Sequence, residues 1–281
     1  MRIADALAEP ALPRLERQLL LAHAVGHPAP ARASAWLLAH DDHTLTPAER
    51  MAFETAVARR RAGEPVAYIL GRREFYGRDF LCSPAALIPR PETEHLVEQV
   101  LALLPPAVPG QAAPTLLDVG TGTGCIAITL ALERPAAEVV AVDVSEDALA
   151  LARRNADALG AGRMRFIRSN WLSEVPAAMR FDLIVSNPPY VRGGDPHLFQ
   201  GDLRFEPWLA LTDRADGLTA YRILAAATAT HLRPGGHLLV EHAHDQAEAV
   251  GAIFAAAGLT AIATTTDLAG LPRVTLARLP A

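Results

Sequence analysis

The hydrophobic pattern divides the chain into two stretches with different periodicities. Up to residue 62, apolar residues recur at the spacing of amphipathic helices, which predicts four or five short helices. From residue 115 onward, short apolar runs alternate with amphipathic stretches, as expected when strands alternate with helices. Such alternation predicts a mostly parallel sheet with helices on both faces, and therefore the α/β fold class.

The individual elements follow from the same pattern. Thr46-Pro47-Ala48-Glu49 resembles a helix start, with a capping residue before proline. Residues 66–71 and 74–80 have the alternation of a strand pair that links two domains. The expected helices cover residues 3–7, 15–25, 33–40, 47–62, 92–104, 126–132, 148–159, 217–231 and 245–257. The expected strands cover residues 115–119, 138–143, 164–168, 181–186, 236–241, 259–266 and 274–279, the last two as an antiparallel pair.

These elements divide the chain into three parts. We expect an N-terminal helical domain over residues 1–71, a β-hairpin linker over residues 72–90 and an α/β domain over residues 91–281. A proline-rich loop over residues 105–110 precedes the first strand of the sheet. A length of 281 residues is enough for one large domain and one smaller domain.

A glycine-rich loop follows the first expected strand of the α/β domain. It consists of Gly120, Thr121, Gly122, Thr123 and Gly124, and an apolar helix comes directly after it. Glycines at these positions let the backbone turn tightly and approach a ligand closely. The next expected strand ends in an acid, Asp143, about twenty residues after the loop, where nucleotide-type sites hold a ribose hydroxyl. Dehydrogenases and methyltransferases share this pattern, so it predicts a nucleotide-type cofactor without choosing between them.

A second motif, Asn187-Pro188-Pro189-Tyr190, follows the expected strand over residues 181–186. Neither proline can donate an N–H, so the strand ends here with its last carbonyl oxygens facing outward. The side-chain oxygen of Asn187 and the carbonyl of Pro188 suit an NH2 group that donates two hydrogens. Tyr190 offers a flat face for a planar substrate group. The motif favours a methyltransferase acting on an amide-like nitrogen; an Asn-Pro turn that merely ends a strand is the simpler alternative.

Composition narrows the class of protein further. Hydrophobic residues make up 51% of the chain, but no apolar run approaches the roughly twenty residues of a membrane span. The N-terminus does not resemble a secretory signal, so we expect a cytoplasmic enzyme. A formal net charge of −5 does not favour a nucleic-acid binder, which usually carries a basic surface. Cys82 and Cys125 lack metal-ligand spacing, and His242 and His244 lack a third ligand, so no metal site is expected.

Several segments together resemble the peptide chain release factor N5-glutamine methyltransferases, the PrmC/HemK family, over nearly the whole chain. The most specific begins with Arg-Ala-Gly-Glu-Pro and ends at a glycine, and a second contains Pro-Arg-Pro-Glu-Thr-Glu. The asparagine motif alone is shared with other families, whereas the combination is not. The segments that carry the resemblance are residues 61–71, 75–77, 87–94, 118–124, 187–190, 200–207 and 273–276.

The resemblance implies a fold, a reaction and a set of site residues. The fold is a Rossmann-like class I methyltransferase with a mostly parallel seven-stranded sheet and a small N-terminal helical bundle. The reaction transfers a methyl group from S-adenosyl-L-methionine to the glutamine nitrogen in the Gly-Gly-Gln motif of class 1 release factors. Residues 120–124 and Asp143 would bind the methionine and ribose portions, Trp171 would lie near the adenine, and residues 187–190 would hold the glutamine, with Asn187 also bordering the cofactor. Asn170 stands where relatives often have aspartate, so a weaker or rearranged adenine contact is expected.

Three other functions remain possible on the sequence alone. A ribosomal-protein glutamine methyltransferase would use the same site on another protein. A methyltransferase for exocyclic amines of nucleic acids would use the same acceptors, but only 5% of this chain is aromatic and its charge is negative. A cofactor-binding module without catalysis would not need the complete asparagine motif. We therefore expect class 1 release factors as partners of a monomer, recognised in part by the N-terminal helices, with no direct nucleic-acid or membrane contact.

Overall fold

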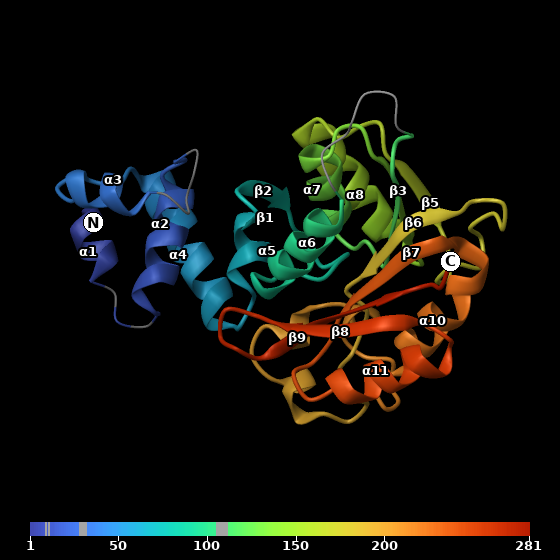
Figure 1. Cartoon of the computed structure of the whole chain (residues 1–281). Helices are drawn as coiled ribbons and strands as arrows, with labels where there is room; N and C mark the ends of the chain where they lie inside the picture. The colour runs from blue at the N-terminus through green and yellow to red at the C-terminus, as the bar shows by residue number, and fades with distance from the viewer. Residues whose placement is uncertain (9, 11, 28–32, 105–111) are drawn as a thin grey trace.

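The computed structural model describes residues 1–8, 10, 12–27, 33–104 and 112–281. A helical N-terminal part leads through a short hairpin into a larger α/β part (Figure 1). The loop expected over residues 105–110 lies outside the described residues. Within the described residues, no helix is both long enough and apolar enough to span a bilayer.

The N-terminal part contains the helices expected from the sequence. The longest, α4, begins with a capping box in which Thr46 Oγ1 accepts from the Glu49 amide at 3.2 Å and the Glu49 carboxylate accepts from the Thr46 amide at 2.8 Å. Leu20, Leu37 and Phe53 meet in a core that belongs to these helices. The helices are α1 (Ile3–Leu7), α2 (Arg14–Ala24), α3 (Ser34–Ala39), α4 (Pro47–Arg61) and α5 (Val66–Leu70).

The segment between the two parts corrects the sequence prediction. Residues 66–71 were expected as a strand, but they form helix α5, which follows Pro65 and ends at the left-handed Gly71, with φ of 70°. A short apolar run cannot be distinguished from a buried helical turn by periodicity, whereas the flanking proline and glycine are helix signals. The expected strand over residues 74–80 divides into β1 (Arg72–Phe75) and β2 (Arg78–Leu81), an antiparallel hairpin that turns at residues 76 and 77.

The α/β part is built on a seven-stranded sheet with the order β5-β4-β3-β6-β7-β9-β8. The neighbouring strands β5, β4, β3, β6 and β7 pair in parallel. Strand β9 pairs antiparallel with both β7 and β8, as expected for the last two strands. The strands are β3 (Thr115–Val119), β4 (Glu138–Asp143), β5 (Arg165–Arg168), β6 (Phe181–Ser186), β7 (Leu232–Glu241), β8 (Thr260–Thr266) and β9 (Pro272–Arg278).

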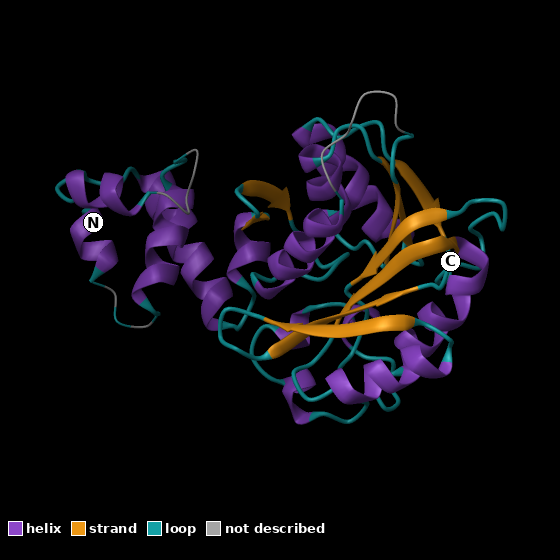
Figure 2. Cartoon of the chain, viewed as in Figure 1, coloured by secondary structure: helices purple, strands orange, loops and turns teal. Residues whose placement is uncertain are grey.

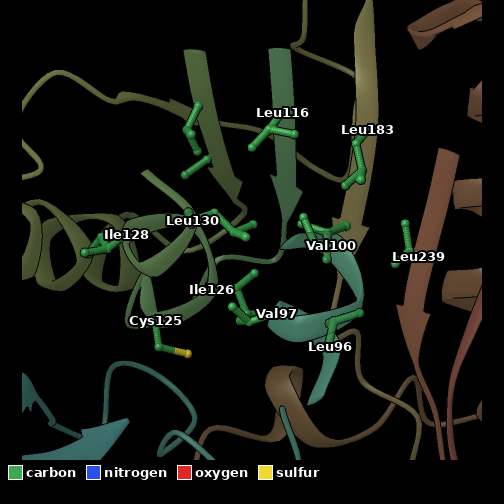
Figure 3. Packing of buried hydrophobic residues seen from close by; sticks show 14 of the residues in the cluster. Leu96, Val97, Val100, Leu116, Cys125, Ile126, Ile128, Leu130, Leu183 and Leu239 are labelled. Carbon is green, nitrogen blue, oxygen red and sulfur yellow. The ribbon is translucent and has the colours of Figure 1, made fainter. Parts of the chain in front are cut away.

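Helices cover both faces of the sheet (Figure 2). On one face, Val97 and Val100 of α6 lie with Ile126 and Leu130 of α7 against strand residues such as Leu116 (Figure 3). Helices α10 and α11 cover the other face, and burying each large apolar side chain contributes about 1.5–3 kcal/mol. The helices are α6 (Glu92–Leu103), α7 (Cys125–Glu133), α8 (Glu146–Leu159), α9 (Trp208–Leu211), α10 (Thr219–His231) and α11 (Ala247–Ala256), with 3-10 turns η2 (Pro196–Phe199) and η3 (Leu203–Phe205).

The strand order places a topological switch point at the centre of the sheet. The chain runs from β3 outward through β4 to β5 and then returns to β6 on the other side of β3. Loops that leave the carboxyl ends of β3 and β6 therefore diverge, and ligands of open α/β sheets bind in the crevice between them. Both motifs found in the sequence follow these two strands.

Candidate active site

A pocket of about 550 Å³ opens at this switch point. Its walls come from the loops after β3, β4, β5 and β6, from residues 85–90 of the linker, and from a segment around α9. The lining residues extend from Ala85 to Thr219, so the structure brings together residues that are far apart in the chain. Of the residues expected to bind a cofactor, the pocket is lined by Gly120, Thr121, Gly122, Thr123, Asp143, Asn170, Trp171 and Asn187.

The glycine loop owes its shape to left-handed backbone. Gly120, Gly122 and Gly124 have φ values of 76°, 57° and 82°, which glycine adopts without the clash that a Cβ causes. The Gly120 and Thr121 amides both donate to the Val142 carbonyl at 2.9 Å, which ties the loop to β4. Gly124 does not line the pocket, and a Cβ there would lie 2.7 Å from Ile128 Cδ1. Its glycine is required for the entry into α7.

Two carboxyl groups support the loop from the ends of β3 and β4. Thr121 Oγ1 donates to Asp118 Oδ2 at 2.7 Å, and burial raises the pKa of Asp118 to about 7. Asp143 accepts from the Gly122 amide through Oδ2 and from the Ser145 amide through Oδ1, each at 2.9 Å. Burial raises the pKa of Asp143 as well, against the lowering effect of these amides. The Asp143 carboxylate is therefore held in one orientation at the pocket wall.

Asn170 and Trp171 follow β5 and form a third wall. The Asn170 amide donates to Glu174 Oε2 at 2.8 Å and its carbonyl accepts from Ser173 Oγ at 2.7 Å. Within the part of the chain that the structure describes, the Asn170 side chain has no hydrogen-bond partner, and it is exposed. Trp171 has a φ of 55°, which is uncommon for a bulky residue and directs attention to a functional constraint. Its half-buried ring lines the pocket.

The four residues of the asparagine motif occupy different environments. Asn187 and Pro189 line the pocket, whereas Pro188 is buried. Tyr190 is half-buried and does not belong to the lining; burial raises the pKa of its hydroxyl. Asn187 Nδ2 donates to Thr93 Oγ1 at 3.0 Å, so the amide is anchored from helix α6. Asn187 therefore lines the same pocket as the glycine loop, whereas Tyr190 lies outside the pocket lining.

Tyr190 belongs to a buried polar network beneath the motif. Its hydroxyl lies 3.4 Å from Glu241 Oε1, and its carbonyl accepts from Gln246 Nε2 at 3.0 Å. Gln246 Nε2 also lies 3.3 Å from the Gly217 carbonyl, and the Tyr221 hydroxyl donates to the Glu241 carbonyl at 3.0 Å. These bonds connect the motif to β7 and α10, and they fix the path of the chain as it leaves the pocket.

The rim of the pocket is closed by contacts between residues that lie far apart in the chain. Glu206 is fully buried, accepts from the Ile88 amide at 2.9 Å and forms an ion pair with Arg90. Burial raises the pKa of Glu206, with Arg90 acting in the opposite direction. Asp202 of the same segment pairs with Arg60 of α4 at 2.7 Å. The segment over residues 200–207 therefore joins the linker, the pocket rim and the N-terminal helices, and only contacts between distant residues show this.

The two histidines after β7 differ in burial, since His244 is exposed and His242 is not. His242 is buried, and its ring nitrogens bond to Thr275 Oγ1 and to the Ala243 carbonyl, both at 2.8 Å. Burial lowers the pKa of His242, so its neutral form is favoured. Across the described ranges, no group of three or more His, Cys, Asp or Glu side chains has the arrangement of a metal site.

The fold and the position of the pocket define the class of protein. A methyltransferase small domain model matches residues 96–201. The structure superimposes on a methyltransferase from Pyrococcus furiosus with a TM-score of 0.55 and 18% identity, over 81% of this chain and 100% of that one. It also superimposes on a T. thermophilus 16S rRNA N2 G1207 methyltransferase in complex with AdoMet and guanosine, with a TM-score of 0.52 and 21% identity, over 74% and 49% of the two chains. The protein therefore has the fold of the class I S-adenosylmethionine-dependent methyltransferases.

Relatives identify the particular family. A model of the PrmC N-terminal domain matches residues 2–71. The release factor glutamine methyltransferase of Bordetella pertussis is 50% identical over 96% of both chains, and that of Escherichia coli is 42% identical over 95% of this chain and 92% of its own. The corresponding enzyme of Xylella fastidiosa is 48% identical over 98% and 96%. The chain belongs to the release factor glutamine methyltransferase family, which confirms the resemblance and the fold class inferred from the motifs.

Proposed function

We propose that the chain transfers the methyl group of S-adenosyl-L-methionine to the side-chain amide nitrogen of the glutamine in the Gly-Gly-Gln motif of class 1 release factors. The observation that carries this proposal is the meeting of the glycine loop, Asp143 and Asn187 in one pocket at the switch point. Release factor glutamine methyltransferases are similar to this chain over almost its full length, which supports the choice of substrate.

The pocket fits the proposed cofactor in size and in its donor and acceptor groups. About 550 Å³ lies within the range of roughly 300–1,000 Å³ that small-molecule sites occupy. The left-handed glycine loop presents backbone rather than side chains, which suits the methionine portion, and Asp143 can accept from ribose hydroxyls. Trp171 can contact the adenine, and the Asn170 side chain can exchange hydrogen bonds with its edge. S-adenosyl-L-methionine supplies a methyl group on a positively charged sulfur.

Orientation carries much of the proposed catalysis. An amide nitrogen is a weak nucleophile because its lone pair is delocalised into the carbonyl. We propose that Asn187 Oδ1 and the Pro188 carbonyl accept the two amide hydrogens of glutamine and direct the nitrogen at the methyl carbon. The N–C bond forms as the C–S bond breaks, and its electrons go to sulfur. Both acceptors stabilise the positive charge that develops on nitrogen, and the proton leaves after transfer, when the nitrogen has become far more acidic.

We further propose that the helical domain over residues 1–71 recognises the body of the release factor. A tripeptide loop offers little contact area, so specificity requires a second surface. The helices are joined to the pocket rim by the Arg60–Asp202 ion pair, and Arg204 donates to the Ala62 carbonyl at 2.9 Å. A partner bound to the helices would therefore lie beside the pocket whose rim these contacts support.

A labelling experiment tests the proposal. The purified protein is incubated with methyl-labelled S-adenosylmethionine and, separately, with a class 1 release factor, the same factor with the glutamine replaced, ribosomal proteins, and tRNA or DNA. We expect label on that single glutamine, located by mass spectrometry, and no label on the substituted factor. Label confined to a ribosomal protein or to nucleic acid would preserve the chemistry and overturn the substrate. Cofactor binding without transfer to any substrate would overturn the enzyme.

A further inference from the structure

Thr93 lies between the asparagine motif and a buried carboxyl group. It stands in the first turn of α6, is 2% exposed and lines the pocket. Its Oγ1 accepts from Asn187 Nδ2 at 3.0 Å. A threonine hydroxyl has one hydrogen and two lone pairs, so this bond leaves its hydrogen free to donate.

Glu241 is a second buried side chain beneath the asparagine motif. It ends β7, is 1% exposed, and its Oε1 lies 3.4 Å from the Tyr190 hydroxyl. Within the described part of the chain, the buried Oε2 has no hydrogen-bond partner. Burial raises the pKa of Glu241 to about 7, and the nearby Thr93 hydroxyl is the strongest influence that lowers this pKa. An unsatisfied carboxyl oxygen and an available hydroxyl hydrogen are thus complementary.

We propose that Thr93 and Glu241 are positioning residues that fix the amide of Asn187 with Oδ1 toward the substrate. This inference rests on the proposed function of the pocket. When the Thr93 hydrogen is directed at Glu241, Oγ1 offers only lone pairs to Asn187. Reversal of the amide would place its oxygen against the threonine oxygen, so Nδ2 faces Thr93 and Oδ1 is left to accept from glutamine. Within the described residues, Oδ1 accepts no hydrogen bond.

The alternative is that Thr93 only stabilises the start of α6, where its amide donates to the Arg90 carbonyl at 3.1 Å. Two substitutions separate the roles, because Thr93→Val keeps the branched shape and removes the hydroxyl, while Thr93→Ser keeps the hydroxyl and removes the methyl group. We expect Thr93→Val to lower kcat toward the release factor about 10- to 100-fold. We expect Thr93→Ser to recover most of that loss, and both variants to bind S-adenosylmethionine within about twofold of wild type by calorimetry.

A mutant cycle asks whether Thr93 acts through Asn187. Residues that work as one unit are strongly non-additive, so Thr93→Val should cause little further loss in an Asn187→Ala background. Glu241→Gln replaces one acceptor oxygen by a donor, and we expect it to lower kcat with little further loss when Thr93→Val is added. Losses that multiply in these backgrounds would overturn the inference, as would full kcat in Thr93→Val or equal loss in the Val and Ser variants. If the wild-type protein does not methylate the glutamine, the proposed function itself is wrong. The variants test only the positioning role, because their kcat values are compared with that of an active wild type.

Discussion

The glycine loop and the asparagine motif follow neighbouring parallel strands, yet they are held in place by different means. The glycine loop is shaped by contacts that are close in the chain: Thr121 to Asp118 spans 3 positions, and Gly122 to Asp143 spans 21. The asparagine motif is anchored from afar, with 94 positions between Asn187 and Thr93 and 51 between Tyr190 and Glu241. The proposed cofactor half of the site is therefore largely local, whereas the proposed substrate half depends on α6 and β7.

The two halves also share a feature. Each contains a carboxyl that is almost wholly buried, and burial raises the pKa of both Asp118 and Glu241 to about 7. Asp118 supports the loop that follows its own strand, while Glu241 lies beside Tyr190 of the motif that follows another strand. The glycine loop is held by contacts within and beside its own strand, so a substitution there is tested by the free energy of unfolding. The asparagine motif is held by distant elements and faces the proposed substrate, so a substitution there is tested by turnover.

The largest expected effect concerns the substrate half. Asn187→Ala removes one of the two proposed acceptors, and we expect kcat to fall at least about 100-fold because the lost interaction acts on charge that develops in the transition state. Cofactor affinity should change little if the glycine loop is an independent half. The measurement is release-factor methylation beside calorimetric titration with S-adenosylmethionine. Wild-type turnover in a folded Asn187→Ala variant would contradict the two-acceptor mechanism.

The second prediction concerns the backbone of the glycine loop. Gly124→Ala places a Cβ at a φ of 82° and 2.7 Å from Ile128 Cδ1, so we expect the free energy of unfolding to fall by about 2 kcal/mol. Gly160→Ala is a matched control, since its φ is 81° but nothing lies within 4 Å of the added Cβ. That variant should lose about 1 kcal/mol. Urea unfolding measures both, and equal losses would show that contact with α7 is unimportant.

The third prediction concerns the buried carboxyl beneath the glycine loop. Because the folded pKa of Asp118 is raised from 3.8 to about 7, folded protein binds more protons than unfolded protein between these pH values. The contribution of Asp118 to stability is therefore present at low pH and is lost as pH rises toward 7. Relative to Asp118→Asn, wild type should lose on the order of 1 kcal/mol per pH unit in this window. Denaturant unfolding at pH 5, 6 and 7 measures it; a constant difference would show an ordinary pKa.

The smallest expected effect concerns the third wall of the pocket. Asn170→Asp supplies a carboxylate, and hydrogen bonds to ionised acceptors are roughly twice as strong as neutral ones. We expect S-adenosylmethionine to bind roughly threefold more tightly, with kcat little changed. Calorimetric titration of both proteins is the measurement. Weaker binding would show that the carboxylate is repelled by the nearby Glu174, whose Oε2 accepts from the amide of residue 170 at 2.8 Å.

The amino-acid sequence by itself determined the class of fold and much of the proposed cofactor half. The central strands were predicted correctly because they are buried on both faces and therefore read as short continuous apolar runs. The antiparallel final pair was right because no helix separates its strands. The prediction for residues 66–71 was wrong because five apolar residues fit a strand or a helical turn equally well. Glycines with positive φ could be anticipated because their conformation is a local property.

Only the tertiary structure decided what surrounds the asparagine motif. Thr93 lies in a segment that carries the family resemblance, but the residues next to Thr93 and Glu241 in the sequence do not show what either side chain contacts. Their meeting with Asn187 and Tyr190 follows from the packing of α6 against β7 beside the switch point. Glu206 likewise reaches Ile88 across 118 positions. Periodicity reports which face of an element is buried, whereas the partner that an individual buried polar atom finds depends on where the elements pack.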